Sequence, residues 1–440
     1  MQPERRVQPL PAPDRLDSWK EIAAYLNRTE RTVRRWEDTE DLPVHRLQHD
    51  KRGSVYAYTR ELDAWRVSRR VVEETADEVP TKRIHPGWWA GGALVLVIVA
   101  IAIGISLDVR AEDARIAERG TSNEEAWQAF QRARFGDNAG RVQIETGIRY
   151  YQQAIRLDPE FAQAWVGLAT AHMALTWFGE QPAADTMQEA RREAEEARRL
   201  DASLSGSWRV LGYVSHYVDW NHQEAEGHFR RAIALDPADA GAQSWYGDFL
   251  LDMRRFDEAR AAYKRAQAAN PRWLEPPIFA ANVDTLTGQP ARAILEQRRT
   301  LETEPNYGLG NHFLGRAYLA SGDWTQALQH LRKSNALMGA VPFSLGDLGH
   351  ALAVSGQRDE AVRMRDELVA RRAKGYYPAF PIAAIEAGLG NTDAALDWLE
   401  LAVGERHTGF YFPSADSIYD RIRTEPRFRD LMARMNLPTP

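Results

Sequence analysis

Residues 221–271 read NHQEAEGHFRRAIALDPADAGAQSWYGDFLLDMRRFDEARAAYKRAQAANP, and this stretch repeats one pattern along its own length. Ala225 and Phe229 are followed 34 residues later by Ala259 and Tyr263, a small and a large residue on one helical face. A proline ends each unit, and helices stop there because proline lacks the amide hydrogen. The pattern predicts stacked helices in a constant register. The small residue recurs every 34 positions, at Ala225, Ala259, Ala293, Ala327, Ala361 and Ala395.

The period of 34 resembles that of tetratricopeptide-repeat proteins, in which each repeat is a helix–turn–helix unit. Junction prolines keep the same period at Pro237, Pro271 and Pro305. The resemblance implies a mainly α fold, an α-solenoid of helical hairpins with a concave groove that binds peptides or partner proteins. Small residues stand where the first helix of a pair meets its neighbour, at Gly247, Ala281, Gly315, Gly349 and Ala383.

This register extends over residues 123–404 and predicts about eight repeats. Gly339 and Ala373 stand where junction prolines belong, so we expect altered turns there. Residues 405–440 leave the register. Their apolar positions predict a terminal helix that caps the exposed end of the stack, with Ile418, Ile422, Phe428, Leu431 and Met435 facing inward.

The resemblance also implies which positions of each first helix point into the groove. We expect them to bind an unknown protein or peptide rather than a small metabolite. The alternative is that they are ordinary solvated residues, and that the array is a spacer or a dimerisation scaffold. The candidate partner-binding residues are Ser244, Asp248, His312, Arg316 and His350.

Residues 15–71 predict a small DNA-binding domain that begins with a helix-turn-helix. One helix buries Ile22, Ala23 and Leu26, and Asn27 lies at the turn because asparagine tolerates the left-handed conformation. Thr29 caps a second helix that begins at Glu30. Because Val33 and Trp36 face the core, the exposed side of the second helix carries Arg31, Arg34 and Arg35, residue types that bind guanine edges or phosphates.

A hairpin and a third helix follow. Residues 44–47 and 54–58 predict two strands, and the turn between them carries Lys51 and Arg52, placed for backbone phosphates. A third helix is expected from Arg60. The whole stretch resembles MerR-type and excisionase-type winged helix-turn-helix domains, which implies that the second helix and the wing bind duplex DNA. The alternative is a head that kept this fold and binds protein.

Residues 88–107, WWAGGALVLVIVAIAIGISL, hold no charged side chain. Twenty residues match a hydrocarbon core of about 30 Å, so they predict a single transmembrane helix. Residues 1–14 are expected to be a disordered tail and residues 72–87 a juxtamembrane linker. The DNA-binding head favours a cytoplasmic N-terminus in the cytoplasmic (inner) membrane, with the repeats extracytoplasmic. Ala100 and Gly104 are spaced for close helix approach, which predicts a possible homodimer.

The amino-acid composition excludes several kinds of functional site. The 440 residues include no cysteine, which excludes disulfides and thiolate metal sites. The net charge of −6 restricts any nucleic-acid site to a local patch. We find no catalytic constellation, no metal site and no cofactor motif, and therefore expect a protein that is not an enzyme.

Two functional hypotheses follow. In the first, the protein is a membrane-anchored transcriptional regulator whose head binds DNA and whose repeats bind a partner outside the cytoplasm. In the second, it is a membrane-anchored scaffold or adaptor for an envelope protein complex, and its head binds protein.

Overall fold

The computed structural model describes residues 14–40, 42–46, 55–72, 119–134, 141–179, 182–407 and 415–438. The contacts divide the chain into two units, Met1–Ile101 and Ala102–Pro440, which are described separately below. We call the first the head and the second the array. The predicted tail, linker and transmembrane segment lie outside the described residues, apart from Asp14 and Val72. Among the helices that are described, none is both long and apolar enough to cross a bilayer.

The head contains two helices, a small sheet and a third helix. Helix α1 (Trp19–Tyr25) is capped by Ser18, whose hydroxyl accepts a hydrogen bond from the Glu21 amide. Asn27 adopts a φ of 51°, in the left-handed region predicted for it. Helix α2 (Glu30–Glu40) follows, and α3 (Thr59–Val72) closes the unit.

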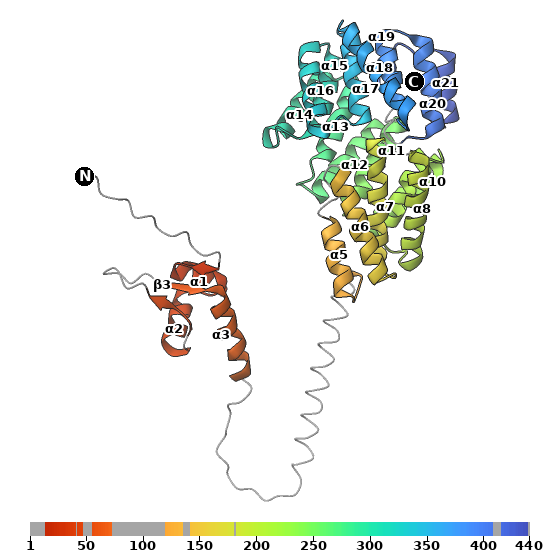
Figure 1. The fold of residues 1–440 in the computed structure, drawn as a ribbon. Helices are drawn as coiled ribbons and strands as arrows, with labels where there is room; N and C mark the ends of the chain where they lie inside the picture. Colours follow the sequence, from red (N-terminus) through yellow and green to blue (C-terminus); the bar gives the residue numbers. More distant parts are fainter. Residues whose placement is uncertain are drawn as a thin grey trace, which may run out of the picture. The chain divides into compact units, whose positions relative to one another are not determined.

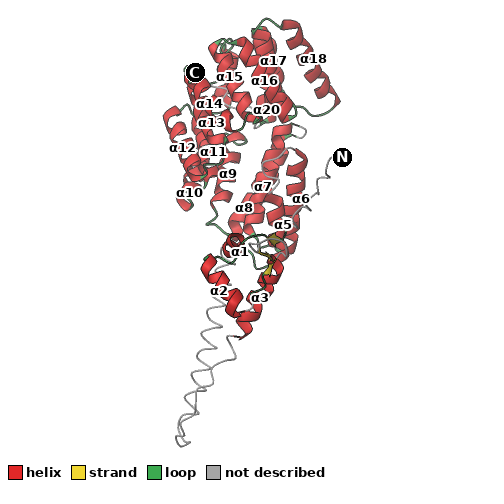
Figure 2. Cartoon of the chain, turned by 90° about the vertical axis from the view of Figure 1, so that its left-hand side faces the viewer, coloured by secondary structure: helices red, strands yellow, loops and turns green. Residues whose placement is uncertain are grey.

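The sheet of the head is antiparallel, and Figure 2 shows its strands beside α1. Strand β3 (Val55–Tyr58) lies between β1 (Arg15–Leu16) and β2 (His45–Arg46). The sequence pattern predicts β2 and β3 but not β1, because two residues are too few to show an alternation. The core of the head consists of Ile22, Ala23, Leu26, Val33, Leu42, Val55, Ala57 and Leu62.

The array is helical, which confirms the predicted α-solenoid. Its described residues form eight helical pairs that follow one another in Figure 1. The pairs are α5 (Glu124–Arg134) with α6 (Arg141–Leu157), α7 (Ala162–Leu175) with α8 (Ala183–Leu200), α9 (Ser205–Tyr217) with α10 (His222–Leu235), α11 (Ala240–Asp252) with α12 (Phe256–Ala269), α13 (Glu275–Leu286) with α14 (Pro290–Thr303), α15 (Gly308–Ser321) with α16 (Trp324–Met338), α17 (Pro342–Val354) with α18 (Arg358–Lys374), and α19 (Phe380–Leu389) with α20 (Thr392–Glu405).

Small residues permit the close packing within and between pairs, as their spacing predicts. A Cβ atom at Gly247 would lie 2.6 Å from the Tyr263 ring, and one at Gly315 would lie 2.7 Å from the Leu331 side chain. The junction without proline at Gly339 is made differently, because Gly339 ends α16 in the left-handed conformation with a φ of 73°.

The chain after α20 packs against the end of the stack. A short 3-10 helix, η2 (Ser417–Tyr419), leads to α21 (Pro426–Arg434), which lies beside α20 in Figure 1. We call residues 415–437 the C-terminal segment. Its apolar side chains share one core with α19 and α20, including Ile418, Tyr419, Ile422, Phe428, Leu431 and Met432.

The array also closes on itself. A Cβ atom at Gly179, after α7, would lie 2.7 Å from Pro342 and 2.8 Å from Pro378. Asn436 donates a hydrogen bond to the Trp220 carbonyl over a sequence separation of 216 residues. Early and late repeats are therefore in contact, an arrangement that a periodic sequence does not reveal.

Candidate functional site

The first helices of successive pairs lie along one side of the array, and contacts join α9 to α11, α13 to α15, α15 to α17 and α17 to α19. We call the surface made by α9, α11, α13, α15, α17 and α19 the inner face. All five residues predicted to bind a partner lie on it. Ser244, Asp248, His312 and His350 are buried, and the Arg316 side chain is 10% exposed. Their role in binding stays a prediction. The groups that cover these residues determine whether a partner can reach them.

Asp248 and Ser244 lie on α11. The Asp248 carboxylate accepts a hydrogen bond of 2.7 Å from the Tyr263 hydroxyl. Burial raises the pKa of Asp248 to about 8, because the charged form loses its hydration. Among the described residues, the Ser244 hydroxyl has no hydrogen-bond partner.

An ionic cluster joins α15, α17 and the C-terminal segment. The Arg316 guanidinium donates a 2.6 Å hydrogen bond to Asp416 and lies 3.5 Å from Asp347. His312 Nε2 lies 3.1 Å from the same Asp347 oxygen. Burial opposes the charge of Arg316, but Asp416 and Asp347 outweigh it and raise its pKa. Likewise, burial opposes ionisation of Asp347, but Arg316 and His312 hold its pKa below the ordinary value.

His350 lies on α17 near this cluster. Its Nδ1 lies 3.0 Å from the Ala384 carbonyl oxygen, which can only accept, so Nδ1 carries the hydrogen. Burial lowers the pKa of His350. The side chain is therefore neutral at pH 7 and links α17 to α19.

A second polar cluster lies where α9 and α10 meet the end of the chain. His222 Nε2 donates a 2.8 Å hydrogen bond to the Met435 carbonyl. Burial and the neighbouring His216 lower the pKa of His222 to about 4, so its Nδ1 is unprotonated near pH 7. His216 Nδ1, 2.9 Å away, must then donate to it, while His216 Nε2 faces Asp252 at 2.9 Å.

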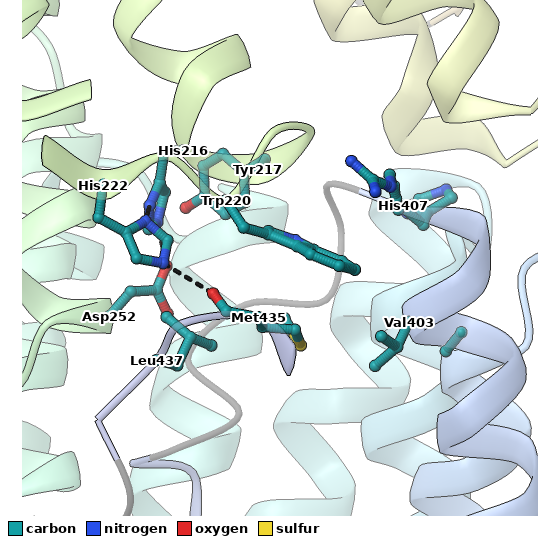
Figure 3. A pocket seen from close by; sticks show the side chains of 11 residues that line it. His216, Tyr217, Trp220, His222, Asp252, Val403, His407, Met435 and Leu437 are labelled. Carbon is teal, nitrogen blue, oxygen red and sulfur yellow. Dashed lines mark hydrogen bonds and ion pairs between the residues drawn. The ribbon is translucent and has the colours of Figure 1, made fainter. Parts of the chain in front are cut away.

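A cavity of about 20 Å³ lies beside this cluster, which is room for one water molecule and not for a metabolite. Figure 3 shows the Trp220 indole extending from the histidines toward His407 and Val403. In the part of the chain that is described, no group of three or more histidine and carboxylate side chains could hold a metal ion. The cavity is lined by His216, Tyr217, Trp220, His222, Asp252, Ala402, Val403, Arg406, His407, Met435 and Leu437.

In the head, α2 presents its arginines to solvent. Thr29 accepts a hydrogen bond from the Thr32 amide at the start of the helix. The Arg34 guanidinium lies 3.8 Å from Glu30 and 5.0 Å from the centre of a Trp19 ring. Arg31 and Arg35 are exposed and form no ion pair with another described residue. Lys51 and Arg52, the predicted wing residues, lie outside the described residues.

Sequence reasoning missed the partners that complete the inner face. Asp347, Asp416, His216, His222 and Asp252 carry no local signal, since each acts through a contact with a distant part of the chain. The spacing of His312 and Asp347 was the one available signal. They stand 35 residues apart, close to the repeat length, which places them near each other on successive first helices.

Comparison with known proteins supports the repeats. Two tetratricopeptide-repeat family models match, one at residues 221–276 and one at residues 312–337. Superkiller complex protein 3 of Mus musculus is 26% identical over 236 residues, and that of Homo sapiens is 25% identical. Each match covers 52% of this chain and 14% of the relative, so the chain spans about one seventh of the length of these relatives.

Solved structures that align with part of the chain include PilF of Pseudomonas aeruginosa, at 19% identity and a TM-score of 0.37, covering 48% of this chain and 91% of that one. The APC/C hetero-tetramer Cut9–Hcn1 aligns at 16% identity and a TM-score of 0.47, covering 74% of this chain and 58% of that one. The chain contains tetratricopeptide repeats, and its array is a helical solenoid of that type.

Proposed function

We propose that this protein is a protein-binding adaptor whose array holds a segment of a partner protein on its inner face. The observation that carries the proposal is that the inner face already holds a polypeptide. The C-terminal segment reaches α15 through Asp416 and the turn between α9 and α10 through Asn436. A surface that accommodates a peptide in this way has the hydrogen-bonding groups and the shape to hold another.

The polar side chains on the inner face support a peptide rather than a metabolite as ligand. Asp248, Arg316 and His350 stand at equivalent positions of three first helices and differ in the hydrogen-bonding groups that they offer. Such a row provides separate contacts along an extended chain, each of modest strength. The cavity lined by His216, His222 and Asp252 has room for one water molecule and not for a metabolite.

Site-specific photo-crosslinking in the full-length chain tests the proposal. A photoreactive residue at Trp245 or Phe279, both half-buried on first helices, is expected to capture a partner. The matched control is Leu295 on the second helix α14, which is 52% exposed. A reproducible partner that crosslinks from Leu295 and from neither inner-face position overturns the proposal.

We propose a second function for the head, which is binding of duplex DNA. The observation that favours it is the exposed arginine row of α2, with Arg31, Arg34 and Arg35 on one side of the helix. Arginines on the second helix of a helix-turn-helix are placed for a major groove. The competing proposal is a head that binds an acidic protein surface, and DNA binding by a head fragment distinguishes the two.

A further inference from the structure

The end of α20 and the C-terminal segment both contact the turn between α9 and α10. We call this contact the seam, and it is made by Val218, Trp220, His222, Arg406, Met435 and Asn436. The Arg406 guanidinium donates to the Val218 carbonyl and lies 4.3 Å from the centre of a Trp220 ring. His222 donates to the Met435 carbonyl, and Asn436 donates to the Trp220 carbonyl at 3.0 Å.

The C-terminal segment supplies the carbonyl in one of these hydrogen bonds, because His222 donates to Met435. That bond does not depend on the sequence that supplies the carbonyl, so another peptide backbone can accept from His222 in place of the segment. The Asn436 side chain donates to the Trp220 carbonyl, and that bond is lost when the segment leaves.

The backbone near the seam is held in a strained conformation. Trp220, Arg406 and Asn436 have φ values of 55°, 51° and 54°, in the left-handed region that favours glycine. Strain of this kind clusters at clamps and switches. The strain opposes the closed arrangement and favours its release.

The C-terminal segment makes one charged contact with the inner face, through the Asp416 side chain. Asp416 is 4% exposed and binds Arg316 on α15, and Tyr419, three residues later, is buried against the same core as α19. Arg316 keeps Asp347 as a second carboxylate partner when Asp416 leaves. The inner face therefore does not retain an unpaired buried cation in the open state, which limits the cost of release.

We propose that the C-terminal segment is a pseudo-ligand of the inner face, displaced by a partner peptide that carries an acidic residue followed three positions later by an aromatic one. This inference rests on the proposed function of the array. The acidic residue takes the place of Asp416 on Arg316, and the aromatic one takes the place of Tyr419. The seam then opens because His222 donates to a carbonyl of the incoming peptide instead of to Met435.

A fluorescent peptide with the sequence of residues 415–437 tests the inference on the full-length chain by anisotropy. We expect weak binding to the unmodified protein, whose own segment blocks the site. Asp416→Asn loosens that segment and is expected to tighten peptide binding roughly tenfold or more. Adding Arg316→Gln to that variant should abolish the gain, and so should a peptide that itself carries the Asp416→Asn change.

The matched control is Asp397→Asn, which removes a carboxylate from an exposed pair with Arg427 on α20 and α21. It should bind the peptide as weakly as the unmodified protein. If Asp416→Asn does not fold by circular dichroism, Arg406→Gln opens the seam without touching the ionic cluster and is expected to give the same gain. Equal binding by all folded variants overturns the inference.

The two proposals fail in different ways. Photo-crosslinks to a partner from Trp245 or Phe279, without any gain of peptide binding in Asp416→Asn or Arg406→Gln, leave the adaptor function standing and overturn the pseudo-ligand. Gain of peptide binding with partner crosslinks from Leu295 alone overturns the adaptor function and shows only that the segment detaches.

Discussion

Arg316 and Asp416 are one hundred residues apart in the chain, and the guanidinium of one donates a 2.6 Å hydrogen bond to the carboxylate of the other. This bond joins a first helix in the middle of the array to the segment that follows its last pair. It makes the inner face and the C-terminal segment one cooperative unit. The stability and the accessibility of the inner face are therefore linked.

A double-mutant cycle on this pair measures that link. Arg316→Gln alone is expected to lower the free energy of unfolding by about 3 kcal/mol, because it leaves the buried Asp416 carboxylate without its cation. Asp416→Asn alone should cost less, because Arg316 keeps Asp347 as a carboxylate partner. The double variant should lose less than the sum, with a coupling of about 1–3 kcal/mol. Urea unfolding followed by circular dichroism gives the four values, and strict additivity would show that the two side chains act independently.

Asp248→Asn should stabilise the protein in a pH-dependent way. The pKa of Asp248 is raised to about 8, so the folded chain holds a proton that the unfolded chain releases above about 4. The contribution of this proton to the free energy of unfolding is therefore complete below about pH 4 and is lost as the pH rises toward 8. Asparagine is neutral throughout and still accepts from Tyr263. We expect a gain of at most about 5 kcal/mol at pH 8 and almost none at pH 4; a gain equal at both pH values would contradict the buried-acid explanation.

His407 should make the array sensitive to acid. Burial lowers its pKa to about 4, whereas an unfolded histidine titrates near 6.5. The unfolded chain therefore binds more protons between these values, and stability that is complete above pH 6.5 is lost as the pH falls to about 4. The loss is about 3 kcal/mol at most. His407→Gln should flatten this part of the curve, and an unchanged pH profile of the melting temperature would refute the assignment.

Gly247→Leu should disrupt the packing of α11 on α12. A Cβ atom at this position would lie 2.6 Å from the Tyr263 ring, which is fully buried and cannot move aside. Overpacking of this kind costs about 1–3 kcal/mol. Gly227→Ala is the control, since no atom lies within 4 Å of a Cβ at that helical position, and it should stabilise by up to about 1 kcal/mol. Equal effects of the two changes on urea unfolding would mean that the contact is not tight.

The head should bind duplex DNA with a steep salt dependence. In a fragment of residues 1–80, Arg34→Ala with Arg35→Ala should weaken binding and reduce the slope of log K against log salt by about 2, one for each lost phosphate contact. Arg66→Ala removes an equally exposed arginine from α3 and should have little effect. Mobility-shift titrations at several salt concentrations decide the matter. Failure of the folded fragment to bind DNA at low salt would favour a head that binds protein.

The sequence determined the repeating part of this protein. Local periodicity is enough for that, because Ala225, Gly247 and Pro237 specify helix contacts within one pair and recur in each neighbour. In the head, Asn27 and Thr29 mark the turn and the cap through their own backbone chemistry. These features depend on residues a few positions apart, and a sequence displays such relationships directly.

Only the tertiary structure determines which residues of the inner face are covered. The sequence places Asp248, Arg316 and His350 in equivalent positions but does not say that they are buried, because burial depends on the curvature summed over many repeats. That curvature brings Asn436 to Trp220 across 216 residues and Asp416 to Arg316 across 100. Small rotations at each junction fix these contacts, and no single repeat encodes their sum.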